Sequence, residues 1–194
     1  MINILKKHKL ILASKSPRRS ELLTRAGIPF TIRTQEVAEV YPDDLPTAEV
    51  AEYLAKLKAN ASRPTMGEDE IILGADSIVI LDDTIYGKPK DIADAHRILS
   101  ELSGRMHEVI TGVCLLSSKE EVSFSAVSKV WMGKLSEEEI NYYIETYKPF
   151  DKAGAYAIQE WIGLCKIEKI EGTYDNIMGL PVAGVYRELE KEWR

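Results

Sequence analysis

Residues 10–19 read LILASKSPRR, an apolar run, Leu10–Ala13, followed directly by small polar and basic residues. A short apolar run that closes in this way is typical of a buried strand ending in a loop. Ser16 is a favourable helix N-cap, Pro17 suits the first helical position, and Gly27 suits the end of that helix. The stretch therefore predicts a strand, a loop and a helix in succession.

Two arginines, Arg18 and Arg19, fall in the first turn of this expected helix. The dipole makes that end of a helix partly positive and favours acidic residues there. A pair of arginines makes electrostatic sense if an anion binds them, because helix N-termini are ready phosphate sites. From these residues alone, a solvated arginine pair is the alternative.

Strand-like and helix-like segments alternate along the rest of the chain. This alternation predicts an α/β fold with a mixed twisted sheet and flanking helices. The sequence has no internal repeat, and no linker divides it into independent domains. Residues 1–194 are therefore expected to form a single domain with two lobes around a central cleft. The pattern predicts strands at 30–33, 71–75, 77–81, 107–117, 122–132 and 162–170, and helices at 47–61, between Asp91 and Gly104, at 136–147 and from about Pro181.

The composition is that of an ordinary globular protein. The chain has 194 residues, 45% of them hydrophobic, and a formal net charge of −6, which argues against a nucleic-acid polymer or an anionic membrane as partner. No apolar stretch approaches the roughly 18 residues of a membrane span, and Met1–Lys7 has no signal-peptide pattern, so we expect a cytoplasmic protein. Cys114 and Cys165 each lie in an apolar run and are expected to be buried thiols.

Asp76 interrupts a long apolar stretch, between Ile71–Ala75 and Ser77–Leu81. A carboxylate is costly to bury there unless it is paired, binds a cation or opens into a cleft. The alternative is an aspartate at a strand end that accepts hydrogen bonds from backbone amides. Since ligand crevices of open α/β sheets lie at strand ends, Asp76 and the Ser14–Arg19 loop are expected to share one.

Several weaker signals accompany Asp76. Lys58 lies on an apolar helix face, where a boundary lysine is the alternative, and Lys88 stands on a tight turn. Gln159 follows an apolar pair and either binds a ligand edge or belongs to the loop. Phosphate-loop, dinucleotide-binding and nucleophile-elbow motifs are absent from the sequence. One embedded carboxylate, separated cations and a nearby Glu36 or Glu39 fit metal-assisted phosphate chemistry better than acyl transfer.

Taken in order, these motifs resemble the Maf family of nucleoside triphosphate pyrophosphatases. Each motif is short, but their ordered succession covers nearly the whole chain. The matching positions are Ser14–Arg19, Glu39, Leu54–Ala59, Gly74–Ser77, Gly87–Pro89, Leu102–Gly104 with His107, Thr111–Gly112, Asp151–Tyr156, Ile158–Gln159 and Gly179–Pro181.

The resemblance implies a cytoplasmic hydrolase with an inosine triphosphatase-like fold and a divalent cation, Mg²⁺ or Mn²⁺. It would convert a nucleoside triphosphate, most specifically dTTP or UTP, to the monophosphate and pyrophosphate. It also implies a homodimer. In the roles it implies, the catalytic base is Asp76, the metal carboxylates are Glu39 and Asp76, and the substrate-binding residues are Ser14, Arg18, Arg19, Lys58, Ser77, Lys88, Lys152 and Gln159.

Some positions depart from the family pattern. Ala38 precedes Glu39 where an acidic residue is common, Ser77 replaces a threonine, Lys129 replaces a glutamate, and Glu160-Trp161 replaces a glycine-containing pair. Two alternatives stay open at this point. One is the same reaction on a modified or purine nucleotide such as 7-methyl-GTP, and the other is a non-catalytic, nucleotide-binding regulator of cell division.

Overall fold

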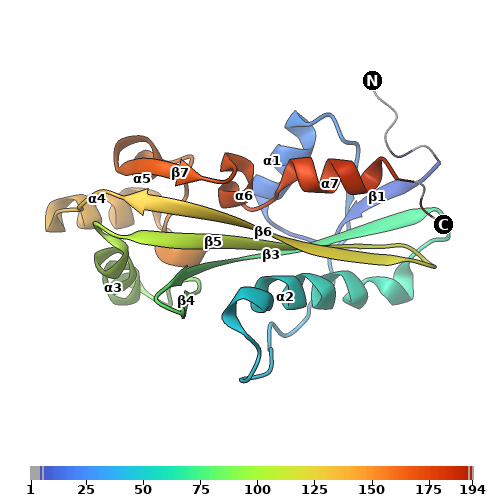
Figure 1. The fold of residues 1–194 in the computed structure, drawn as a ribbon, viewed down its shortest axis with the longest axis horizontal. Helices are drawn as coiled ribbons and strands as arrows, with labels where there is room; N and C mark the ends of the chain where they lie inside the picture. Colours follow the sequence, from blue (N-terminus) through green and yellow to red (C-terminus); the bar gives the residue numbers. More distant parts are fainter. Residues whose placement is uncertain (1–4, 6, 192, 194) are drawn as a thin grey trace. The chain divides into compact units, whose positions relative to one another are not determined.

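The computed structural model describes Leu5, residues 7–191 and Trp193 (Figure 1). Most of the N-terminal stretch, residues 1–4 and 6, lies outside this description. Helices and strands alternate as expected. In chain order they are β1 (Lys9–Leu12), α1 (Pro17–Arg25), β2 (Thr31–Ile32), α2 (Thr47–Ala61), η1 (Arg63–Thr65), β3 (Glu70–Leu81), β4 (Thr84–Tyr86), α3 (Ile92–Leu102), β5 (Met106–Leu116), β6 (Glu121–Met132), α4 (Glu137–Tyr147), η2 (Ala153–Ala155), α5 (Trp161–Cys165), β7 (Ile167–Glu171), α6 (Tyr174–Met178) and α7 (Val182–Leu189).

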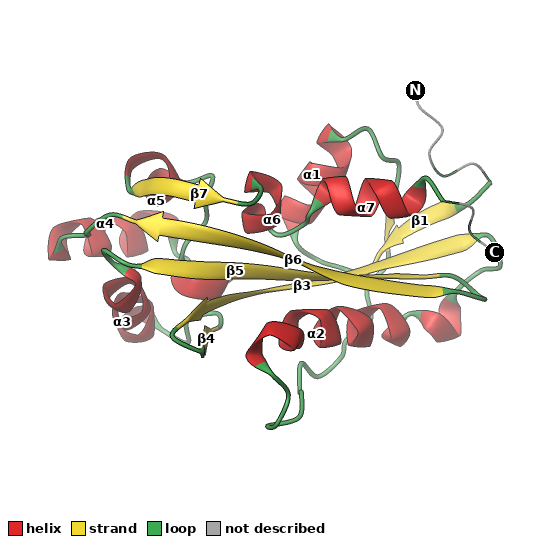
Figure 2. Cartoon of the chain, in the orientation of Figure 1, coloured by secondary structure: helices red, strands yellow, loops and turns green. Residues whose placement is uncertain are grey.

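The sheet is mixed, which confirms the expected fold class. Its strands follow the order β2-β1-β3-β5-β6-β7, with β4 paired to β3. Figure 2 shows the long strands β3, β5 and β6 side by side. Strand β1 runs parallel to both β2 and β3, whereas the β3–β4 and β6–β7 pairs are antiparallel.

The chain divides into two compact units. Unit 1 comprises Met1–Asp76, Thr111–Ala126 and Gly179–Arg194, and unit 2 comprises Ser77–Ile110 and Val127–Met178. The long strands β3, β5 and β6 contribute residues to both units. In β3 the boundary falls between Asp76 and Ser77.

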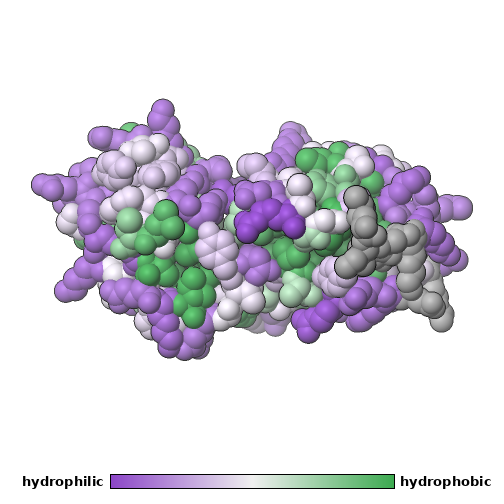
Figure 3. All heavy atoms as spheres, turned by 90° about the horizontal axis from the view of Figure 1, so that it is seen from above, coloured by the Kyte–Doolittle hydropathy of each residue, from purple (hydrophilic) through white to green (hydrophobic). Residues whose placement is uncertain are grey.

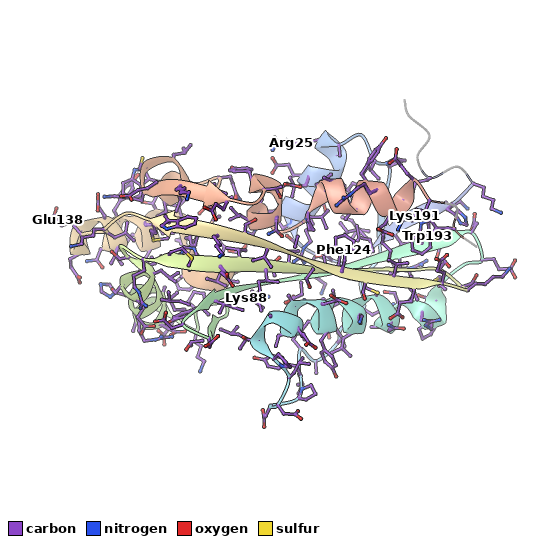
Figure 4. All side chains as sticks on the ribbon, viewed as in Figure 1. Arg25, Lys88, Phe124, Glu138, Lys191 and Trp193 are labelled. Atoms are coloured by element: carbon purple, nitrogen blue, oxygen red, sulfur yellow. The ribbon has the colours of Figure 1, made fainter. Side chains whose placement is uncertain are left out.

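In unit 1, helices lie on both sides of the strands, with α2 on one side and α7 on the other (Figure 1). Glycines allow the close approach of α2: a Cβ on Gly74 would stand 2.4 Å from the Ala55 carbonyl oxygen, and one on Gly112 would stand 2.3 Å from the carbonyl carbon of Ala51. On the other side, Gly184 of α7 faces the ring of Phe124 on β6, which is labelled in Figure 4. Backbone-on-backbone packing thus fixes α2 against β3 and β5.

In unit 2, helices α3 and α4 pack on each other and share an apolar core with β3, β5 and β6. Asp91 caps α3 by accepting from the Asp94 amide at 2.8 Å. Ser136 and Glu139 form the capping box expected at the start of α4. Both helix starts are therefore encoded locally, as expected from the sequence.

Three expectations were wrong in detail. Strand β3 runs without a break from Glu70 to Leu81, because Asp76 keeps an extended backbone inside it. The predicted strand at 162–170 is instead the short helix α5 followed by β7, since Gly163 packs its backbone directly against Ile158. Cys165, at the end of α5, is exposed rather than buried, while Cys114 is buried as predicted.

The surface shows the ordinary mixture of residue types. Figure 3 shows hydrophilic residues over much of one face, with hydrophobic patches among them. Within the described part of the chain, every helix is too short or too polar to cross a membrane.

Candidate active site

The loop after β1 is organised by the buried side chain of Arg19. Its Nε donates to the carbonyl oxygen of Gly179 at 2.8 Å, and its Nη1 donates to Ser14 Oγ at 3.0 Å. Ser14 Oγ also accepts from the Ser16 amide at 3.2 Å. Arg19 therefore joins the start of α1 to the turn before α7, within unit 1.

Burial separates the two arginines of the motif. Arg19 is only 8% exposed, and this burial lowers the pKa of its guanidinium, while the nearby Asp76 carboxylate opposes the shift. Arg18 is partly exposed on the first turn of α1. Of the pair, Arg18 is thus better placed for a ligand, and Arg19 holds the loop that presents it.

A lysine with two carboxylates forms the charged centre of unit 1. Lys58 Nζ lies 2.8 Å from Glu39 Oε1 and donates to Asp76 Oδ1. Glu39 comes from the segment between β2 and α2, Lys58 from α2 and Asp76 from β3. The structure therefore brings together three residues that the sequence separates widely.

The position of Asp76 on β3 explains how a carboxylate fits inside a strand. Strand β1 pairs with β3 from Glu70 to Leu73, and β4 pairs with it from Val79 to Leu81, so Asp76 lies between these two registers. Its side chain reaches Lys58 although the residue is only 8% exposed. The carboxylate is thus paired with a cation, as its burial requires.

The carboxylates of Glu39 and Asp76 fit a magnesium site in their chemistry. Mg²⁺ binds through one or two carboxylates together with substrate phosphates and water, and these two carboxylates already converge on one cation, the Lys58 ammonium. Within the described residues, no group of three or more His, Cys, Asp or Glu side chains could hold a metal ion alone. A metal at this site would therefore share its coordination with the substrate.

The remaining predicted site residues belong to unit 2. Ser77 follows Asp76 on β3, and exposed Lys88, labelled in Figure 4, follows β4. The turn that carries Lys88 is joined to the loop after α4, because the Gly154 amide donates to the Gly87 carbonyl at 3.1 Å. Lys152 and Gln159 lie in that loop region, so three of these four residues come from connected segments.

Two residues organise this loop region: Tyr143, which sequence reasoning did not select, and Glu160, which it noted only as a departure from the family pattern. Tyr143 is fully buried in α4; its hydroxyl donates to Glu160 Oε2 and accepts from the Ala157 amide at 3.0 Å. Lys152 Nζ lies 3.4 Å from Glu160 Oε1 and 2.8 Å from Asp151 Oδ1. A tyrosine on the apolar face of a helix signals only core packing, whereas its buried hydroxyl requires a polar partner.

His107 forms a second buried polar pair in unit 2. Its Nε2 lies 2.7 Å from the Tyr156 hydroxyl, with the two rings edge to face. Burial lowers the pKa of His107 to about 4 and raises that of Tyr156. His107 is therefore a neutral core residue of β5.

We expect His107 to make stability depend on pH. An unfolded chain protonates this histidine below about pH 6.5, whereas the folded protein resists protonation until about pH 4. The free energy of unfolding should therefore fall by about 3 kcal/mol between these pH values. Urea unfolding at pH 7, 6, 5 and 4 measures this, and His107→Gln should flatten the dependence; an equal slope in the variant would contradict the assignment.

The chain is similar to known proteins over almost its whole length. The Maf-like protein family matches residues 9–192. A dTTP/UTP pyrophosphatase of Phocaeicola vulgatus is 52% identical over 192 residues, which cover 98% of this chain and 100% of that protein. A dTTP/UTP pyrophosphatase of Parabacteroides distasonis is 47% identical over 191 residues, which cover 98% of this chain and 99% of that protein. The solved Staphylococcus aureus Ham1 protein aligns at a TM-score of 0.47 and 14% identity, over 64% of this chain and 71% of that chain.

Proposed function

This chain belongs to the Maf family, and from that premise we propose that it hydrolyses dTTP and UTP to the nucleoside monophosphate and pyrophosphate. The relatives named for this activity match over essentially their whole length. The proposed mechanism rests on one observation: in unit 1, Lys58 forms ion pairs with both Glu39 and Asp76.

Asp76 is the proposed general base. Its carboxylate orients a water molecule and takes its proton as the water oxygen bonds to the α-phosphorus. The bond from the α-phosphorus to the bridging oxygen breaks, and the electron pair leaves with pyrophosphate. Lys58 holds the carboxylate in place through its hydrogen bond to Oδ1, so the base has a defined direction.

Cationic side chains would stabilise the charge on the phosphates. We propose Arg18, Lys58, Lys88 and Lys152 as phosphate-binding residues, and Ser14 as part of the loop that approaches the substrate. Arg19 supports this group through Ser14 and the Gly179 carbonyl. Lys152, like Lys58, already contacts two carboxylates, which reduces the charge that either lysine offers a phosphate.

Glu39 and Asp76 would hold the divalent cation. When bound, Mg²⁺ or Mn²⁺ would neutralise phosphate charge and polarise the phosphoryl group.

Gln159 is the proposed contact to the base, supported by Ser77. An amide side chain donates and accepts together, which suits the imide edge of thymine or uracil. In the described part of the chain nothing donates to Gln159 Oε1, although this oxygen is buried. A buried acceptor without a donor is unfavourable, and the imide N–H of the nucleobase would satisfy it.

A pyrophosphate-release assay across nucleoside triphosphates tests the function. We expect turnover with dTTP and UTP in Mg²⁺ or Mn²⁺, at least about tenfold above that with 7-methyl-GTP, and its loss in EDTA with recovery on adding the metal back. A preference for 7-methyl-GTP or another purine nucleotide would favour the first alternative. Release from none of them, with nucleotide binding retained, would favour a regulator of cell division.

Three further properties belong to the proposal. We propose one domain over residues 1–194, a cytoplasmic location and a homodimer. Light scattering coupled to size-exclusion chromatography measures the oligomeric state, and a mass near the 21.8 kDa of one chain would rule out the dimer.

A further inference from the structure

The hydroxyl of Tyr143 is hydrogen-bonded to residues on both sides of Gln159 in the chain. The Tyr143 hydroxyl accepts a hydrogen bond from the Ala157 amide and donates one to the Glu160 carboxylate. These two partners stand on either side of Ile158 and Gln159 in the chain. One side chain of α4 therefore ties down both ends of residues 157–160; we call this arrangement the Tyr143 bridge.

The backbone around the Tyr143 bridge leaves this segment little freedom. The Glu160 amide donates to the Ala157 carbonyl at 3.1 Å, which closes residues 157–160 into a turn. A Cβ on Gly163 would stand 1.6 Å from the Ile158 carbonyl oxygen, so the following helix rests directly on the turn. The direction of Gln159 is thus set by the turn, and the turn is set by the Tyr143 bridge.

The Tyr143 hydroxyl of the bridge stays protonated, so its hydrogen bonds keep the same direction. Burial, together with the hydrogen bond to Glu160, raises the pKa of the Tyr143 hydroxyl, so it stays protonated near neutral pH and remains a donor. The other carboxylate oxygen of Glu160 lies 3.4 Å from the Nζ of Lys152, a residue that is only 7% exposed. Each polar group of the bridge therefore has a partner of the right kind.

We propose that Tyr143 and Glu160 are positioning residues that orient Gln159 for recognition of the thymine or uracil base. Neither touches the substrate; both act through the turn at residues 157–160. A glutamine held in one direction distinguishes the imide of thymine from the aminopyrimidine edge of cytosine, whereas a free one can rotate its amide and accept either. The inference rests on the proposed function, since it assigns Gln159 to the base of that substrate.

The test measures kcat and KM for dTTP and dCTP in four variants. Tyr143→Phe and Glu160→Leu should raise KM for dTTP about tenfold, leave kcat within about threefold, and lower the dTTP-to-dCTP ratio of kcat/KM about tenfold. Glu160→Gln should keep that ratio, because its amide oxygen still accepts from Tyr143. Tyr142→Phe is the matched control: it removes a hydroxyl from the preceding, half-exposed position of α4 and keeps the ring contact with Trp161.

A failure of the positioning role and a failure of the proposed function give different results. The positioning role is overturned if Tyr143→Phe leaves the dTTP-to-dCTP ratio of kcat/KM unchanged. It is also overturned if Glu160→Gln lowers that ratio as much as Glu160→Leu does. If Tyr143→Phe does not fold, the two Glu160 variants still decide the question. If the unaltered protein releases no pyrophosphate from dTTP or UTP, the proposed function fails, and the dissociation constants of dTTP and dCTP then test the Tyr143 bridge independently of turnover.

Discussion

Asp76→Asn is expected to lower kcat for dTTP hydrolysis by about a thousandfold while the protein stays folded. Asparagine cannot accept the proton of the attacking water, yet its size is the same and its carbonyl oxygen can still accept from Lys58. Lys58 also keeps its ion pair with Glu39. The loss should therefore appear in kcat and not in the melting temperature, and single-turnover pyrophosphate release measures it directly.

The control for Asp76→Asn is a carboxylate lost elsewhere on the same hairpin. Asp83 is exposed in the turn between β3 and β4, with a φ of 60°, a backbone conformation that asparagine tolerates well. Asp83→Asn should keep the kcat of the unaltered protein. If Asp76→Asn retains turnover within tenfold of the unaltered protein, Asp76 is not the base.

Gly112→Ala should lower the free energy of unfolding by about 3 kcal/mol or more. The new Cβ would stand 2.3–2.4 Å from backbone atoms of Ala51 and Glu52, and backbone cannot rotate away as a side chain does. Helix α2 must then lift from β5, which also moves Lys58 relative to Asp76. Thermal unfolding should show a melting temperature lower by about 6–12 °C.

Gly67→Ala is the matched substitution for Gly112→Ala. Gly67 lies in a loop of the same unit, and its Cβ would meet nothing closer than the flexible Glu70 side chain at 3.4 Å. This variant should unfold within about 0.5 kcal/mol of the unaltered protein. Equal melting temperatures for Gly112→Ala and Gly67→Ala would show that α2 does not rest on β5 as described.

Local sequence signals predicted most of the fold because they act over a few residues. Ser16 and Pro17 begin α1, Asp91 caps α3, and Ser136 with Glu139 begins α4. Where the decisive contact is not local, the prediction was wrong. Cys165 lies in an apolar run that is typical of a strand, but the close packing of Gly163 on Ile158 winds this run into a helix.

In the candidate site, too, the sequence predicts the residues with a local signal and misses those whose role depends on distant contacts. Asp76 could be selected from the sequence because a carboxylate inside an apolar run demands a partner, and that partner proved to be Lys58. Arg19 could not be separated from Arg18, since burial is a property of the folded neighbourhood. Tyr143 gave no signal, because its role depends on two groups that follow it by 14 and 17 positions.

The hydrogen bond from Arg19 to Gly179 has a consequence for the newly made protein. It joins residues 160 positions apart, and unit 1 takes its last segment from Gly179 onward. During synthesis the loop that carries Ser14 and Arg19 can gain this hydrogen bond only after most of the chain has been made, and closing so long a loop is a late event in folding. An incomplete chain ending before Gly179 lacks the carbonyl that accepts from Arg19 Nε, so we expect the loop after β1 to become ordered only once Gly179 has been made.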